Sequence, residues 1–162
     1  MRVRLLLLAL LVLACPSFQA QQPAPKPVLY GAPVSLEKAK LAATAAAAEA
    51  EKNGWLMAIA IVDTAGNLVY FQRADSTQTA SLQLAIDKAR SSALFKRSTK
   101  IFEDQVAAGG LGLRQLKSPD VIPIEGGLPL IADGKVIGAI GVSGGMATQD
   151  GQCATVGAAQ IR

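Results

Sequence analysis

The chain has 162 residues, of which 51% are hydrophobic and 17% charged, and its formal net charge is +4. These proportions are typical of one globular domain with a substantial core, and they exclude a disordered chain. Histidine is absent, which excludes Ser-His-Asp and Cys-His catalysis and histidine-ligated metal sites. The small positive charge comes with no basic stripe interleaved with aromatic residues, so we expect no nucleic-acid partner.

Residues 1–20 have the pattern of an export signal. Two arginines precede an apolar run over residues 5–14, which is too short to span a bilayer. Two processing sites remain open: a lipoprotein box that would leave Cys15 lipidated, or cleavage near Ala20. We therefore expect an exported protein, periplasmic or extracellular, whose membrane attachment would be limited to a lipid anchor.

A Pro-rich, polar stretch over residues 21–34 predicts a tether, with Tyr30 expected to pack on the edge of the folded domain. The domain itself is expected over residues 35–162. Ser35 can cap a first helix that ends near Lys52, before an Asn-Gly stop.

Two hairpins are predicted. The apolar run over residues 55–63 is typical of a buried strand, and a turn leads to a return strand over 68–72. Strands over 128–132 and 135–142 flank an Asp-Gly pair, which is a strong hairpin signal because the turn requires positive φ. Two hairpins favour a mainly antiparallel sheet.

Helices are expected between and after the hairpins. Residues 79–96 show the clearest helical periodicity, and a shorter helix is predicted from Ser98 to about Ala108. Residues 111–120 are expected to form a loop, and Thr148 to open a C-terminal helix. The order of elements predicts an α+β domain with helices packed on the sheet.

Glycines flank the second hairpin on both sides. Gly126 and Gly127 precede it, and Gly141, Gly144 and Gly145 stand around its end. A hairpin needs no glycine at these places, and glycine weakens a strand. Two interpretations stay open: close approach of a ligand or another chain, or a tight turn with unusual geometry.

The glycine-rich hairpin resembles the signature of the GlcG/HbpS family, small haem-degrading-type domains related to the C-terminal domain of PduO. The sequence GGLPL over 126–130 and the sequence GKVIGAIGVSGG over 134–145 carry the resemblance. Two supporting matches lie upstream: Arg-Ala-Asp at 73–75, where the family has Arg-x-Asp, and Asp-Lys-Ala at 87–89, where it has a Lys-Ala pair.

The resemblance implies a profilin-like fold, a central antiparallel sheet flanked by helices, and assembly into homo-oligomers. It also implies binding of haem or a related tetrapyrrole. Two departures stand out. Many relatives have an acidic residue where Gly151 stands, which would remove a capping partner of Thr148. Relatives that ligate a metal through histidine cannot serve as templates, because this chain has no histidine.

Nine residues are candidates for binding a cofactor: Arg73, Asp75, Lys88, Gly126, Gly127, Ser143, Gly144, Gly145 and Met146. The turn at 143–145 can offer backbone N–H groups to a propionate or small carboxylate, or can serve only as a strand-to-helix turn. Arg73 can clamp a propionate, or Arg73 and Asp75 can form a surface ion network with each other or with Lys88.

Four side chains remain as candidates to face an iron in the absence of histidine: Tyr70, Met57, Met146 and Cys153. Packing is the competing interpretation for each of them.

The first functional hypothesis is an exported haem- or tetrapyrrole-binding protein that assists haem breakdown or sensing. The second is a non-catalytic oligomeric module that binds a small carboxylate or a partner protein. Because the sequence shows no nucleophile–base pair, a dedicated enzyme is the least favoured interpretation.

Overall fold

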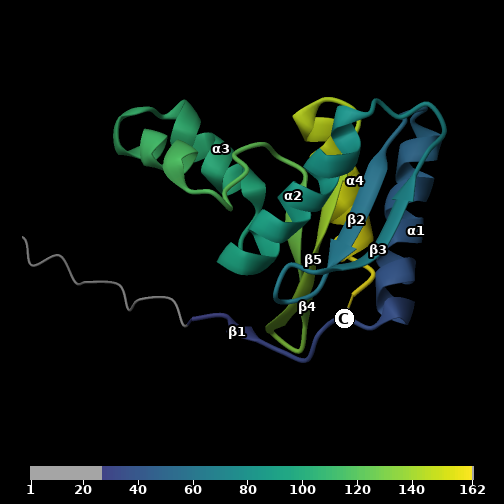
Figure 1. Cartoon of the computed structure of the whole chain (residues 1–162). Helices are drawn as coiled ribbons and strands as arrows, with labels where there is room; N and C mark the ends of the chain where they lie inside the picture. Colours follow the sequence, from purple (N-terminus) through teal and green to yellow (C-terminus); the bar gives the residue numbers. More distant parts are fainter. Residues whose placement is uncertain (1–26, 162) are drawn as a thin grey trace, which may run out of the picture.

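The computed structural model of the protein describes residues 27–161. The expected export signal and Cys15 lie outside the described residues. The elements, drawn in Figure 1, are β1 (Leu29–Tyr30), α1 (Leu36–Lys52), β2 (Ala58–Val62), β3 (Leu68–Arg73), α2 (Ala80–Phe95), α3 (Thr99–Ala107), the 3₁₀ helix η1 (Gly110–Lys117), β4 (Gly127–Ala132), β5 (Lys135–Ser143) and α4 (Ala147–Ala158). Among these described residues, no helix is long and apolar enough to cross a membrane.

The five strands form one mixed sheet, centred on β5. Strand β5 pairs antiparallel with β2 along one edge and with β4 along the other, and β2 pairs antiparallel with β3. Strand β1 adds a short parallel pair with the first residues of β5. Both predicted hairpins are present, and Asp133 and Gly134 turn the second with φ of 50° and 70°.

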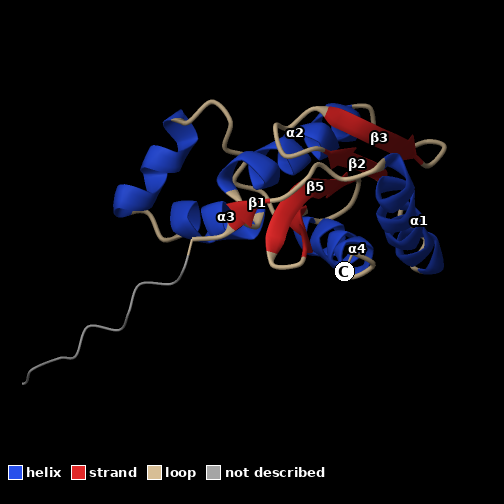
Figure 2. Ribbon diagram, turned by 90° about the horizontal axis from the view of Figure 1, so that it is seen from below, coloured by secondary structure: helices blue, strands red, loops and turns tan. Residues whose placement is uncertain are grey.

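Helices cover both faces of the sheet. Helix α2 packs on one face against the small alanines of β2 and β5, and α1 and α4 pack on the other face against larger aliphatic residues. Figures 1 and 2 show this sandwich from two sides, with α3 and η1 projecting away from it. The architecture is the predicted α+β fold with a central sheet flanked by helices.

Local sequence signals account for several of the boundaries. The Ser35 side chain caps α1 by accepting a hydrogen bond from the Lys38 backbone N–H. Ser98 caps α3 in the same way through Lys100 N–H. Tyr30, expected at the domain edge, donates from its hydroxyl to the carbonyls of Ala93 and Leu94. Part of the Pro-rich stretch therefore belongs to the sheet and contacts α2.

Two details of the sequence-based prediction were wrong. Residues 110–117 form a 3₁₀ helix, where a loop was expected. Helix α4 begins at Ala147 with Met146 as its cap residue, so Thr148 does not open it. The Met146 N–H donates to the Gln149 side chain, so the start of α4 has a capping contact that does not depend on position 151.

Candidate functional site

The strand register gathers most of the candidate residues at one end of the sheet. Ala58, at the start of β2, pairs with Arg73 on one side and with Ser143 on the other. Gly127, at the start of β4, pairs with Gly141 near the end of β5. The ends of β3 and β5 and the beginnings of β2 and β4 therefore meet at this end, although the candidates are spread over residues 73–146.

Lys88 is fully buried beneath this end of the sheet. Its Nζ donates to a carboxylate oxygen of Asp150 at 2.7 Å and to the carbonyl of Val142 at 3.2 Å. The side chains of Lys88 and Asp150 are 0% and 3% exposed. Because Lys88 lies on α2 and Asp150 on α4, this ion pair connects the helices on the two faces of the sheet.

The second carboxylate oxygen of Asp150 binds the glycine turn at 143–146. The Gly145 backbone N–H donates to this oxygen at 3.1 Å. One backbone N–H group of the turn is therefore already bound to the Asp150 carboxylate of the same domain. Burial raises the pKa of the Asp150 carboxyl, and the Lys88 ammonium and the glycine N–H groups oppose that rise.

Gly126 and Gly127 make room for the ion pair and for α2. A Cβ on Gly126, whose φ is +127°, would lie 2.9 Å from the Lys88 Nζ, and one on Gly127 would lie 2.4 Å from the Lys88 carbonyl. Gly127 N–H also donates to the Thr99 hydroxyl at 2.9 Å. These two glycines therefore serve close contacts inside the domain.

Gly144 and Gly145 pack against the start of β2. A Cβ on Gly144 would lie 2.2 Å from the Leu56 carbonyl and 2.9 Å from the Met57 sulfur. A Cβ on Gly145 would lie 3.0 Å from the terminal methyl of Met57. The glycine turn thus lies directly against Met57.

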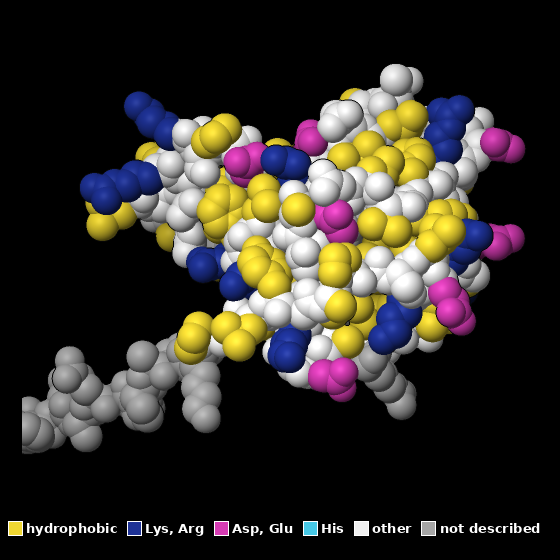
Figure 3. Space-filling view, turned by 60° about the horizontal axis from the view of Figure 1, so that its bottom comes forward, with side chains coloured by type: hydrophobic (Ala, Val, Ile, Leu, Met, Phe, Trp, Pro, Cys, Tyr) yellow, Lys and Arg dark blue, Asp and Glu magenta, His cyan; other side chains and the backbone are white. Residues whose placement is uncertain are grey.

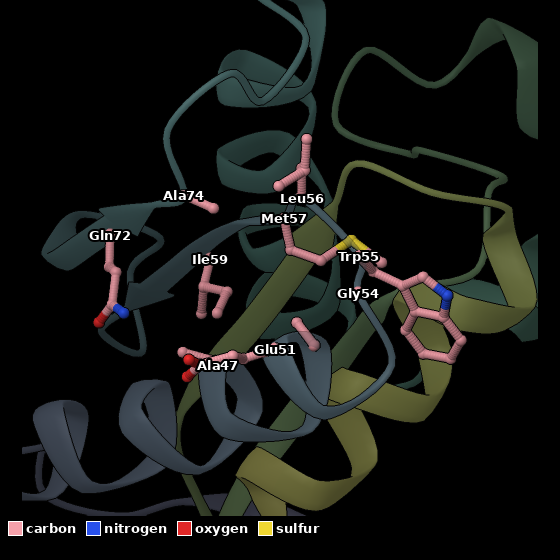
Figure 4. A pocket seen from close by; sticks show the side chains of 10 residues that line it. Ala47, Glu51, Gly54, Trp55, Leu56, Met57, Ile59, Gln72 and Ala74 are labelled. Atoms are coloured by element: carbon pink, nitrogen blue, oxygen red, sulfur yellow. The ribbon is translucent and has the colours of Figure 1, made fainter.

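Met57 is also part of the wall of a cavity of about 360 Å³ between α1 and the hairpin of β2 and β3. Figure 4 shows Ala47 and Glu51 of α1 on one side, Ile59 and Gln72 of the hairpin on the other, and Trp55 at one end. The lining is mostly apolar, as in many small-molecule sites. The lining residues are Ala47, Ala50, Glu51, Gly54, Trp55, Leu56, Met57, Ile59, Gln72 and Ala74.

The cavity opens beside exposed apolar side chains. Leu56 is 49% exposed, and Met146, which follows the glycine turn, is 64% exposed. Met57 itself is 2% exposed and lines the cavity. A planar apolar ligand that enters here would therefore pass Leu56 before it reaches Met57.

The other candidates to face an iron lie elsewhere. Cys153 is fully buried in the core, and burial raises the pKa of its thiol to about 11, which keeps it protonated at neutral pH. Tyr70 is partly buried on β3, and its hydroxyl donates to Gln72 at 3.4 Å. Within residues 27–161, no group of three His, Cys, Asp or Glu side chains could hold a metal ion.

Arg73 and Asp75 are exposed at the end of β3. Neither forms an ion pair within the described part of the chain, and the acidic partner of Lys88 is Asp150. Arg73 shares the sheet face of its pairing partner Ala58, which packs against α2, whereas the cavity lies on the α1 face. The structure thus separates Arg73 from the cavity.

Sequence reasoning missed Asp150 and Glu125. The signal for Asp150 was Lys88 itself, because a lysine among the alanines of a buried helix face needs a buried anion. Glu125 takes the space beside Gly151, where a Cβ would lie 2.2 Å from its carboxylate oxygen. Burial, together with the nearby Glu103 carboxylate, raises the pKa of Glu125.

Comparison with known proteins identifies the family of this chain. A model of the family "Haem degrading protein HbpS-like" matches residues 34–159. Protein GlcG of Escherichia coli K12 is 38% identical over 95 residues, which are 59% of this chain and 69% of GlcG. An uncharacterized 15.0 kDa protein of Citrobacter freundii is 35% identical over 121 residues, 74% of this chain and 85% of that protein.

Solved structures agree with this assignment. A double mutant of HbpS from Streptomyces reticuli superposes with a TM-score of 0.74 at 31% identity, covering 86% of this chain and 99% of HbpS. The crystal structure of a PduOC:heme complex superposes with a TM-score of 0.72 at 28% identity, covering 80% of this chain and 96% of PduOC. The chain belongs to the HbpS-like family.

Proposed function

We propose that the protein binds haem, or a related tetrapyrrole, in the cavity between α1 and the β2–β3 hairpin. The observation that carries the proposal is an apolar cavity of about 360 Å³ with a methionine sulfur in its wall, in a fold shared with a haem complex of PduOC. A haem macrocycle is a planar apolar group, and methionine is one of the side chains that ligate haem iron in proteins.

The residues around the cavity suit this ligand in chemistry and placement. Trp55 and Leu56 offer flat and apolar surface at the opening, and Met57 offers a thioether in the wall (Figure 4). Since the cavity lies at the small end of the size range for ligand sites, part of the macrocycle would stay outside it. Lys52, at the end of α1, is exposed and forms an ion pair with Glu49 at 3.6 Å, which a propionate beside the opening would replace.

The chain's own part in any reaction is to bind and orient the macrocycle. Breakdown of the macrocycle would be redox chemistry of the haem's own iron, and no side chain of the cavity is assigned a catalytic role. We propose, further, that the protein acts after export, in haem handling or sensing, and as a homo-oligomer. Cell fractionation tests export, and light scattering of the purified protein tests the homo-oligomer.

Titration of the purified protein with haemin tests the proposal. A saturable shift of the Soret band is expected for the wild type, and Ala47→Trp, which fills the cavity, should weaken binding at least tenfold. Ala48→Trp is the matched control, because Ala48 is the next residue on α1, is exposed and does not line the cavity. Absence of a saturable shift in the wild type would reject haem binding. Equal binding by the two variants would place haem elsewhere.

A further inference from the structure

The described chain divides into two parts of opposite charge. Residues 96–117, which comprise the turn after α2 together with α3 and η1, are here called the arm. The arm contains five basic and two acidic residues, whereas the rest of residues 27–161 contains seven basic and ten acidic ones. The arm projects from the sheet and helices in both ribbon views (Figures 1 and 2).

Leucines are concentrated on the outer side of the arm. Leu111, Leu113 and Leu116, all in η1, are 72%, 49% and 60% exposed. Ile101, in α3, is 43% exposed. In Figure 3 basic and hydrophobic side chains lie next to each other on the side of the molecule from which the arm projects.

The inner side of η1 contacts α3 through small and polar groups. A Cβ on Gly112 would lie 1.7 Å from the Gln105 carbonyl, so the two backbones touch there. Gln115 donates from its amide to the Gln105 side chain at 2.9 Å. Polar and small residues therefore face the protein, and the leucines face outward, which reverses the usual arrangement of an amphipathic helix.

The 3₁₀ geometry sorts the outward residues into two ridges. With three residues per turn, residues three apart lie in line, so Leu113 and Leu116 form one ridge. Leu111, Arg114 and Lys117 form the adjacent ridge. An apolar ridge beside a basic one is the pattern of a segment that lies in the interface of an anionic membrane.

We propose that the arm docks on an anionic lipid surface, with the η1 leucines inserted at the headgroup boundary and its basic residues against the lipid phosphates. The choice of partner rests on charge complementarity. The arm has an excess of positive charge, which an anionic lipid surface attracts. The rest of residues 27–161 has an excess of negative charge, which the same surface repels. A protein partner would need about 800 Å² per side of complementary surface, more than three leucines on one convex 3₁₀ helix provide.

Vesicle binding of the full chain tests the docking. The probes are vesicles of phosphatidylcholine alone and of phosphatidylcholine with one quarter phosphatidylglycerol, at physiological salt. We expect Arg114→Gln/Lys117→Gln to bind the anionic vesicles at least tenfold more weakly than the wild type. Leu113→Ser/Leu116→Ser should lose binding by a similar factor. Leu36→Ser/Leu41→Ser, which alters two exposed leucines of α1, should bind as the wild type does.

A reporter within η1 separates this contact from any contribution of residues outside the described structure. Leu116→Trp in a Trp55→Phe background should be quenched by brominated anionic lipids, and Leu41→Trp in the same background should not. Equal quenching at the two positions, or none at position 116, would overturn the proposal. An arm variant that binds vesicles normally but changes the size of the protein on light scattering would likewise overturn it and assign the arm to a second copy.

Discussion

The Lys88 ammonium and the Asp150 carboxylate lie 2.7 Å apart, and they connect two helices from opposite faces of the sheet. Removing one partner of a buried ion pair leaves the other charge without compensation, at a cost of about 3–5 kcal/mol. Lys88→Met should therefore lower the free energy of unfolding by that amount in urea titrations. Lys40→Met, at an exposed position of α1, is the control and should stay within about 0.5 kcal/mol. A loss below about 1 kcal/mol for Lys88→Met would show that Asp150 finds solvent or another partner.

Glycine at position 141 allows α2 to lie directly on β5. A Cβ there would lie 2.0 Å from the Ala85 carbonyl, and that backbone cannot move without shifting the helix. We expect Gly141→Ala to lower the unfolding free energy by about 2 kcal/mol or more. Gly134→Asn is the control, since that site is open and asparagine tolerates its φ of 70°. Similar unfolding midpoints for the two variants would contradict the close contact.

Glu125 should make the stability of the protein depend on pH. Burial and Glu103 raise the pKa of its carboxyl in the folded state, so the folded state binds the proton more tightly than the unfolded chain. The stabilising effect of that proton is present below the unfolded pKa and is lost as pH rises through the folded pKa. Glu125→Gln should therefore be more stable than the wild type at pH 7, by a few tenths of a kcal/mol.

The advantage of Glu125→Gln should disappear as pH falls below the unfolded pKa of glutamate, because the wild-type carboxyl is then protonated in both states. Thermal unfolding of both proteins between pH 3 and pH 7 checks this. A constant difference over the whole range would mean that the substitution acts through packing or hydrogen bonding and not through the charge.

Cys153 should be inert in the folded protein. Burial raises the pKa of its thiol to about 11, and its side chain is fully covered by the core. Peptide mass spectrometry after treatment with a thiol reagent at pH 8 should find Cys153 unmodified in the native protein and modified in denaturant. Modification at similar rates in both conditions would contradict the buried position.

Much of the fold could be predicted from local sequence signals. The Ser35 cap, the Asp133-Gly134 turn and the continuous apolar run of β2 each depend on neighbouring residues alone, and each is present. η1 was not predicted, because two glycines and a glycine-spaced run precede Arg114 and because Leu111, Leu113 and Leu116 are exposed and do not form part of the core. Its packing on α3 includes a close contact between Gly112 and the Gln105 backbone, which no local sequence pattern predicts.

The site was harder to predict than the fold. Sequence reasoning identified Lys88 and the glycines. It did not identify Asp150, the partner of Lys88, which lies 62 residues away and on the opposite face of the sheet. The cavity combines α1 with β2 and β3, whose positions depend on packing of the whole domain. Met57 could be named from the sequence as a candidate, but its place between the glycine turn and the cavity required the structure.

The most direct measurement of the central claim is the crystal structure of the protein with haemin, with the iron located by its anomalous scattering. The account predicts an iron peak between α1 and the β2–β3 hairpin, close to the sulfur of Met57. An iron peak on the α2 face or against the arm, with the α1 cavity empty, would contradict it.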